Sequence, residues 1–435
     1  MAAGRRYRLL VAMFQGGGNV PLLLPIVTRL VTRGHRVRFV VGPGVRASRL
    51  PISEHLDRSL RSTGADVIRL RVTDPHPLDA SPGARGVALG WVPGAFRTVS
   101  AEARVACWIP QWAQEVAAEL CREQADAVVA DFILVGVLVA AEAAGIPSVA
   151  LVHNVYRGPV RGRPPWGPGW RPIVGLGGRL RDVAGTLVSN RIQAREALPF
   201  LNRARRSLGL RPVGRYVEQD DRASRIVVLT SPAFDSPEGF PANVRLVGTP
   251  LGDRAPLPAS STWSTEDGRP LVLVSLSTLE QGQAMLMQRI LAALASLPVR
   301  ALVTVGPALD PARFTPPGNV VLARFVPHRS VLPHAAAIVS QCGLGTVMKA
   351  LAAGVPLVCI PLVGDQPENA ARVQGLGAGV RLPPDVDPAH IREAIERVLT
   401  DPAFRLAAQR IAEAIAGEDP VQAAVDEIES VLRAV

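Results

Sequence analysis

The chain alternates short aliphatic runs with amphipathic stretches of helical spacing, and this alternation restricts the possible folds more than any other feature. Near the N-terminus, residues 8–14 have the pattern of a buried strand, and residues 20–33 that of a helix with one apolar side. A glycine-rich turn joins them, and residues 36–41 form the next predicted strand. A strand, a helix and a second strand in this order predict a right-handed crossover between parallel strands.

A second set of alternating strands and helices begins near residue 271, after a stretch rich in proline and serine. We therefore expect an α/β protein with two facing Rossmann-like domains, parallel sheets and a cleft between them. The predicted boundaries are 1–248 for the first domain, 249–264 for a linker, 265–418 for the second domain and 419–435 for a C-terminal helix that packs back toward the first domain. Three Asp-Pro pairs, which begin at Asp387, Asp401 and Asp419, predict capped helices near the C-terminus.

The composition excludes several other classes of protein. Lys349 is the only lysine among 48 basic residues, the arginines are spread along the chain, and aromatic residues make up 4%, so the net charge of +11 does not indicate a nucleic-acid-binding surface. The four cysteines lack the spacing of a zinc site or a disulfide framework, which favours a reducing cytoplasm. The longest apolar tract, residues 125–152, is interrupted by Asp131 and Glu142, so we expect no membrane span.

A glycine-containing loop in the second half indicates a phosphate site. A predicted strand at 336–339 runs into Ser340-Gln341-Cys342-Gly343-Leu344-Gly345-Thr346, and a predicted helix follows at 347–353. A loop of this kind directs unpaired backbone N–H groups and the positive end of a helix toward one point. The next predicted strand, 356–360, ends at a polar cluster over 364–369. A phosphate site beside such a cluster suits a sugar linked to a nucleotide.

The stretch from Phe325 to Leu382, the first glycine turn, Arg33-Gly34-His35 and Val247-Gly248 together resemble the family 1 glycosyltransferases. Members of this family have the GT-B fold, and its bacterial members attach sugars from UDP or dTDP donors to antibiotics and other natural products. The resemblance implies an inverting transfer of a hexose or deoxyhexose to a hydrophobic small-molecule aglycone. It places the donor in the second domain and the acceptor in the first. The sugar nucleotide would be a co-substrate, with no metal and no other cofactor.

The resemblance also implies which residues bind the donor. In order along the donor, they are Phe325, Val326 and His328 at the base and ribose, Ser277, Thr278, Gly343, Gly345 and Thr346 at the diphosphate, and Asp365 and Gln366 at the sugar hydroxyl groups.

Two positions depart from the family pattern. The family loop usually reads Thr-His-Gly-Gly, and here Gln341 replaces the histidine that donates to the pyrophosphate. This predicts that stabilisation of the leaving group is weaker or depends on other donors. Asn19 stands where the family carries its catalytic histidine, and asparagine is not a general base. Three explanations remain open: Asp131 is the base, His153 is the base, or the acceptor is acidic enough to need little help.

Residues 157–171, rich in glycine, proline, arginine and tryptophan, predict a long loop over the first crevice. Trp166 and Trp170 in this loop are candidate acceptor-binding residues. The main alternative function is a weakly active or inactive homologue that acts as an auxiliary partner, and a sugar-nucleotide epimerase of the same fold is a more distant one. A dinucleotide-binding oxidoreductase is disfavoured, because residues 36–43 contain no acidic residue to hold a ribose. A homodimer is compatible with the sequence.

Overall fold

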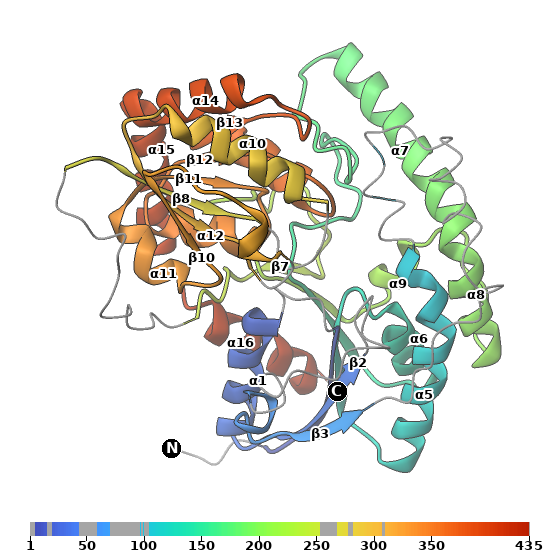
Figure 1. Ribbon diagram of the computed structural model, residues 1–435. Coiled ribbons are helices and arrows are strands. Elements are labelled where there is room, and N and C mark those ends of the chain that lie inside the picture. The colour runs from blue at the N-terminus through green and yellow to red at the C-terminus, as the bar shows by residue number, and fades with distance from the viewer. Residues whose placement is uncertain are drawn as a thin grey trace.

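The computed structural model describes residues 5–14, 20–42, 59–69, 96, 99, 104–252, 268–276, 282–306 and 309–434. These residues form two α/β domains, each built on one parallel sheet, as the sequence predicts (Figure 1). The first sheet has the strand order β3-β2-β1-β4-β5-β6-β7. Its strands are β1 (Arg8–Phe14), β2 (Arg36–Gly42), β3 (Asp66–Arg69), β4 (Ala127–Asp131), β5 (Ser148–Val152), β6 (Arg225–Val228) and β7 (Val244–Leu246).

The second sheet has the strand order β10-β9-β8-β11-β12-β13, and its strands are also paired in parallel. They are β8 (Leu271–Ser275), β9 (Arg300–Thr304), β10 (Val320–Ala323), β11 (Ala335–Ser340), β12 (Leu357–Cys359) and β13 (Gly379–Arg381). In both sheets the strand order reverses beside the first strand, between β1 and β4 and between β8 and β11. Ligands of such sheets bind outside the carboxyl ends of the strands at this reversal.

Helices cover both faces of each sheet, because the strands are apolar on both sides. In the first domain they are α1 (Val20–Thr32), α5 (Ile109–Arg122), α6 (Val135–Ala143), α7 (Leu176–Glu196), α8 (Leu198–Ser207) and α9 (Glu218–Asp221). The second half contributes α10 (Ala284–Ala295), α11 (His328–Val331), α12 (Leu344–Ala352), α13 (Gln366–Gly375), α14 (Pro388–Thr400), α15 (Pro402–Ile415) and α16 (Pro420–Arg433).

The three Asp-Pro pairs begin helices α14, α15 and α16, which confirms that prediction. The carboxylates of Asp387, Asp401 and Asp419 each accept a hydrogen bond from a backbone N–H in the first turn of the helix, at 3.0 Å. Proline at the first helical position has no N–H to leave unsatisfied there. The aspartate side chain therefore satisfies one of the donors that a helix start exposes.

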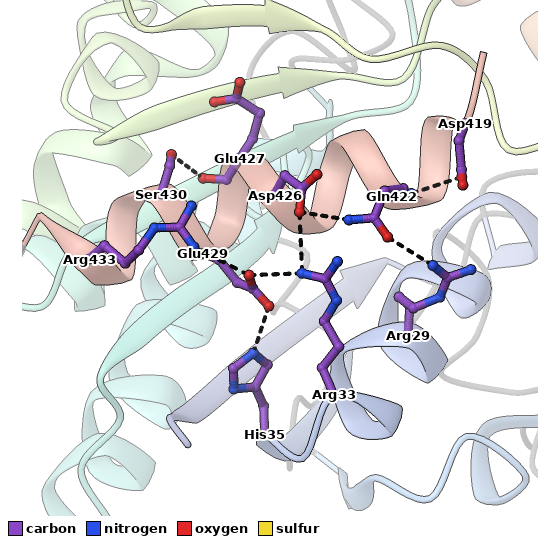
Figure 2. Close-up of polar contacts among 10 residues, drawn as sticks. All are labelled: Arg29, Arg33, His35, Asp419, Gln422, Asp426, Glu427, Glu429, Ser430 and Arg433. Carbon is purple, nitrogen blue, oxygen red and sulfur yellow. Dashed lines mark hydrogen bonds and ion pairs between the residues drawn. The ribbon is translucent and has the colours of Figure 1, made fainter. Parts of the chain in front are cut away.

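The last helix, α16, lies against the first domain although it follows the second (Figure 1). Its buried face, which includes Val425 and Ile428, joins the core between α1 and the first sheet. Polar contacts border this core: Glu429 accepts from Arg33 at 2.8 Å and lies 3.1 Å from His35 Nε2 (Figure 2). The end of the chain thus ties the two domains together.

Candidate active site

The loop between β11 and α12 forms the centre of the candidate donor site. Cys342 has a left-handed backbone with φ of 69°, and its N–H donates to Ser340 Oγ at 3.1 Å. This turn places Gly343 at the N-cap, and α12 begins at Leu344, three residues earlier than predicted. Gly345 and Thr346 therefore lie in the first turn of the helix and not in a loop. A Cβ built on Gly345 would meet no atom within 4 Å, so there is open space beside this turn.

Asp365 lies beside the start of α12, at the end of the loop that follows β12. Its carboxylate accepts from Asn369 Nδ2 at 2.6 Å and from the backbone N–H of Leu344. Asn369 also donates to the carbonyl oxygen of Cys342 at 2.9 Å, so one side chain holds the two loops together. Burial raises the pKa of Asp365, while the hydrogen bond from Asn369 and the charge of His153 oppose that rise.

Gln366 and Gln341 are both buried but differ in their contacts. The side-chain oxygen of Gln366, Oε1, accepts hydrogen bonds from the backbone N–H groups of Leu362 and Val363, at 2.8 and 3.0 Å, and so stabilises the loop after β12. Gln341 Oε1 is buried without a hydrogen-bond partner. The Gln341 amide nitrogen lies beside Gly343, 3.9 Å from where a Cβ on that glycine would be.

At the predicted nucleobase end, Phe325 and Val326 face opposite ways. Phe325 is 78% exposed, whereas Val326 is buried in the core. His328 begins α11, and its Nε2 lies 3.3 Å from Thr304 Oγ1 at the end of β9. Burial, with a smaller contribution from the charge of Lys349, lowers the pKa of His328 to about 4. The imidazole is therefore neutral at pH 7.

The lowered pKa of His328 predicts a loss of stability in acid. Its pKa falls from 6.5 to about 4 on folding, so the unfolded chain binds more protons between these values. The free energy of unfolding should therefore decrease as pH falls from 6.5 toward 4, by about 2–3 kcal/mol from this group. Urea unfolding across this range should show a shallower decrease for His328→Gln. The exposed His390 provides a control, since His390→Gln should not reduce the slope.

Asp131 and His153 come together at the carboxyl edge of the first sheet. Asp131 ends β4 and is fully buried, and its Oδ1 accepts from the N–H of Ile133 at 3.0 Å. His153 follows β5, with its Nε2 3.4 Å from the same carboxylate oxygen. Burial lowers the pKa of His153, but the charges of Asp131 and Asp365 outweigh it, and the net pKa is raised. Asp365 belongs to the second domain, so the two carboxyl edges face each other here.

Three predicted residues, Asn19, Ser277 and Thr278, lie outside the described residues. Within the described part of the chain, no group of three or more histidine, cysteine, aspartate and glutamate side chains could hold a metal ion. None of the described helices is long and apolar enough to cross a membrane.

The structure shows a contact between the two domains that the sequence analysis does not predict. The loop 157–171 crosses to the second domain, where Glu368 Oε1 accepts from the backbone N–H groups of Gly167 and Gly169, at 2.9 and 2.8 Å. Both glycines have positive φ, and a Cβ on Gly169 would lie 2.3 Å from the carbonyl oxygen of Pro367. The sequence signal was the Trp-Gly-Pro-Gly-Trp turn itself, since two glycines around a proline between tryptophans indicate a close backbone approach.

Charged side chains reinforce this contact. Arg372 pairs with Glu368 Oε2 at 3.1 Å and with Asp235 at 3.2 Å, and Arg163 pairs with Asp235 at 2.8 Å. Burial lowers the pKa of Arg372, but the carboxylates of Asp235 and Glu368 have the larger effect, so the pKa of Arg372 is raised. Arg381 donates to the carbonyl oxygen of Gly169. We call Glu368 and its partners Gly167, Gly169 and Arg372 the interdomain latch.

A cavity of about 430 Å³ lies between α13 and the loop 157–171, which we call the latch loop. Trp166 and Trp170, the predicted acceptor residues, both line it. Tyr156 and Phe234 add further aromatic surface, and Arg163 and Arg372 add charge. An apolar cavity with a few polar groups is typical of a small-molecule site.

Comparisons with known proteins agree with this arrangement. Residues 288–431 match the family described as erythromycin biosynthesis protein CIII-like, C-terminal domain. The 4'-demethylrebeccamycin synthase of Lentzea aerocolonigenes is 31% identical over 98% of this chain and 99% of its own. Demethyllactenocin mycarosyltransferase of Streptomyces fradiae is 35% identical over 39% of this chain and 38% of its own.

Solved structures have the same fold. The calicheamicin glycosyltransferase CalG4 superposes with a TM-score of 0.71 at 25% identity, covering 99% of this chain and all of its own. The glycosyltransferase VinC, solved in complex with dTDP, superposes with a TM-score of 0.67 at 19% identity, covering 98% and 100%. The chain is therefore an enzyme of the family 1 glycosyltransferases and belongs to their bacterial natural-product branch, with the GT-B fold.

Proposed function

We propose that this glycosyltransferase moves a hexose or deoxyhexose from a UDP- or dTDP-sugar to a hydrophobic small-molecule aglycone, with inversion and without a metal or other cofactor. One observation carries the proposal: Asp131 and His153 lie together at the carboxyl edge of the first sheet, and the charge of Asp365, beside the start of α12 in the second domain, acts on His153. A sugar placed at Asp365 with its phosphates at α12 then has its anomeric carbon directed toward the first domain. The relatives' names support transfer over epimerisation.

His153 is the proposed base for a hydroxyl acceptor, with Asp131 as its positioning residue. The imidazole takes the proton of the acceptor hydroxyl, whose oxygen bonds to the anomeric carbon as the bond from that carbon to the diphosphate breaks. The nucleoside diphosphate leaves with the electron pair. The same carboxylates that raise the pKa of His153 stabilise the imidazolium that forms. This role compensates for Asn19 at the usual histidine position.

The leaving diphosphate is proposed to meet the first-turn amides of α12, the Thr346 hydroxyl and the amide nitrogen of Gln341. Helix N-termini favour anions, and amide donors aimed at developing charge lower the barrier to departure. The aglycone is proposed to contact Trp166 and Trp170 in the cavity under the latch loop. We also propose a cytoplasmic location, because none of the four cysteines, all in the described part of the chain, forms a disulfide.

Donor binding can be tested without knowing the acceptor. Asp365→Asn should weaken binding of a UDP- or dTDP-sugar about tenfold or more, because one charge-assisted hydrogen bond is worth about 1.5–3 kcal/mol. Binding of the nucleoside diphosphate alone should change little. Thermal shift with each ligand ranks these affinities. Asp385→Asn, at an exposed position, is the matched control. If Asp365→Asn weakens binding of the sugar nucleotide and of the nucleoside diphosphate equally, Asp365 does not contact the sugar. If the parent protein binds neither ligand, the donor site is wrong.

A further inference from the structure

Helix α7 carries an apolar stripe on its outer side. Leu176, Leu180, Val183 and Leu187 recur at spacings of four, three and four, so they lie along one side of the helix. Their exposed fractions are 73%, 62%, 59% and 65%. The helix lies at the periphery of the molecule (Figure 1). So many large aliphatic side chains rarely face water together on one helix unless they contact a partner or a membrane.

The stripe continues onto the segment before the helix. Ile173 is 55% exposed and Val174 is fully exposed. The opposite side of α7 packs on the protein, where a Cβ on Gly185 would lie 2.6 Å from the Trp170 ring. The apolar surface thus lies on the solvent-exposed side of α7 and continues to the fully exposed Val174 before the helix.

The charges around the stripe are positive. Arg171, Arg179 and Arg191 are exposed beside it. The two acidic residues of α7 are occupied elsewhere: Asp182 is bonded to Arg181 at 2.6 Å, and Glu196 is buried. The described outer face of α7 therefore has an apolar centre, cationic borders and no exposed acidic residue. We call the residues 173–191 of this side, together with Arg171, the α7 face.

We propose that the α7 face docks on a lipid bilayer that contains anionic phospholipids. The aliphatic side chains would enter the interface, and the arginines would contact the lipid phosphates, as in other interfacial helices. A second copy of the chain suits this face less well. Pairing two α7 helices would bring arginine borders together without exposed acidic residues to complement them, and the net charge of +11 adds repulsion.

Co-sedimentation with vesicles tests the proposal and does not depend on the proposed function. The chain should bind vesicles with 30% phosphatidylglycerol in phosphatidylcholine, should bind pure phosphatidylcholine about tenfold less tightly or worse, and should be released by salt. The double variant Leu180→Glu/Leu187→Glu should lose binding about tenfold or more. Leu406→Glu, at a position on α15 that is 54% exposed, is the matched control and should bind as the parent does. Arg179→Gln/Arg191→Gln should bind more weakly and with less dependence on salt.

Three results would overturn the proposal. The first is no binding of the parent to anionic vesicles, and the second is equal binding by the parent and the Leu180→Glu/Leu187→Glu variant. The third comes from size-exclusion chromatography with light scattering: a dimeric parent that this double variant makes monomeric would show that the α7 face joins two copies. Because both leucines are exposed, an unchanged melting temperature should confirm that the variant is folded.

Discussion

Replacing His153 by glutamine should lower kcat/KM for transfer to a hydroxyl acceptor by about 10²–10⁴-fold, the range that general-base catalysis contributes. Glutamine fills a similar volume but cannot take the proton. Affinity for the nucleoside diphosphate should stay within about twofold, because His153 lies on the acceptor side of the cleft. His390→Gln, at an exposed position on α14, is the matched control and should leave the rate unchanged. Steady-state kinetics with one donor and one aglycone measure the effect.

The pH dependence of the transfer rate tests the role of Asp131 beside His153. Since the carboxylate of Asp131 helps to raise the pKa of His153, the rate of the parent enzyme should fall as pH drops through a value above 6.5. Asp131→Asn should move this fall to lower pH and also reduce the maximum rate, since the imidazolium loses its partner. A rate that His153→Gln leaves unchanged would instead favour an acidic acceptor or Asp131 as the base.

Removing the Glu368 carboxylate should have the largest effect on stability. Glu368→Ala leaves the amides of Gly167 and Gly169 without their acceptor and Arg372 without one of its two carboxylates. Breaking such a buried pair from one side costs about 3–5 kcal/mol, so the free energy of unfolding should fall by about that amount. Glu368→Gln keeps an oxygen for the glycine amides and should lose less. Urea unfolding measures both variants.

Hydrogen exchange can locate the effect of the latch. The amides of Gly167 and Gly169 should exchange much faster in Glu368→Ala, because their acceptor is gone. Glu413→Ala, an exposed glutamate on α15, is the control and should change neither stability nor exchange. If Glu368→Ala lowers the free energy of unfolding by less than about 1 kcal/mol and leaves amide exchange at both glycines unchanged, the latch does not hold the loop 157–171.

The two parallel sheets and the turn after β11 could be predicted because their signals are local. A strand, a glycine loop and an amphipathic helix are contiguous in sequence, and each Asp-Pro pair caps the helix that follows it. The start of α12 was placed three residues late, because Gly345 and Thr346 suggested a loop. In the structure the left-handed Cys342 completes the turn, which lets the helix begin at Leu344.

Contacts between distant residues could not be predicted in the same way. Glu368 meets Gly167 and Gly169 across 201 and 199 positions, and no periodicity of the sequence connects them. The role of Asn369 in joining Cys342 to Asp365 also depends on how two loops meet. The sequence suggests Asp131 and His153 only as alternative bases, because their 3.4 Å approach depends on the register of β4 against β5.

Titration of His153 by NMR tests most directly whether the two carboxyl edges meet at this residue, and it needs no acceptor. The chain has seven histidines, so comparison with His153→Gln identifies the signal. We expect a His153 pKa above 6.5 in the parent, and a lower value in both Asp131→Asn and Asp365→Asn. A pKa at or below 6.5, or one that Asp365→Asn leaves unchanged, would contradict an active site shared between the two domains.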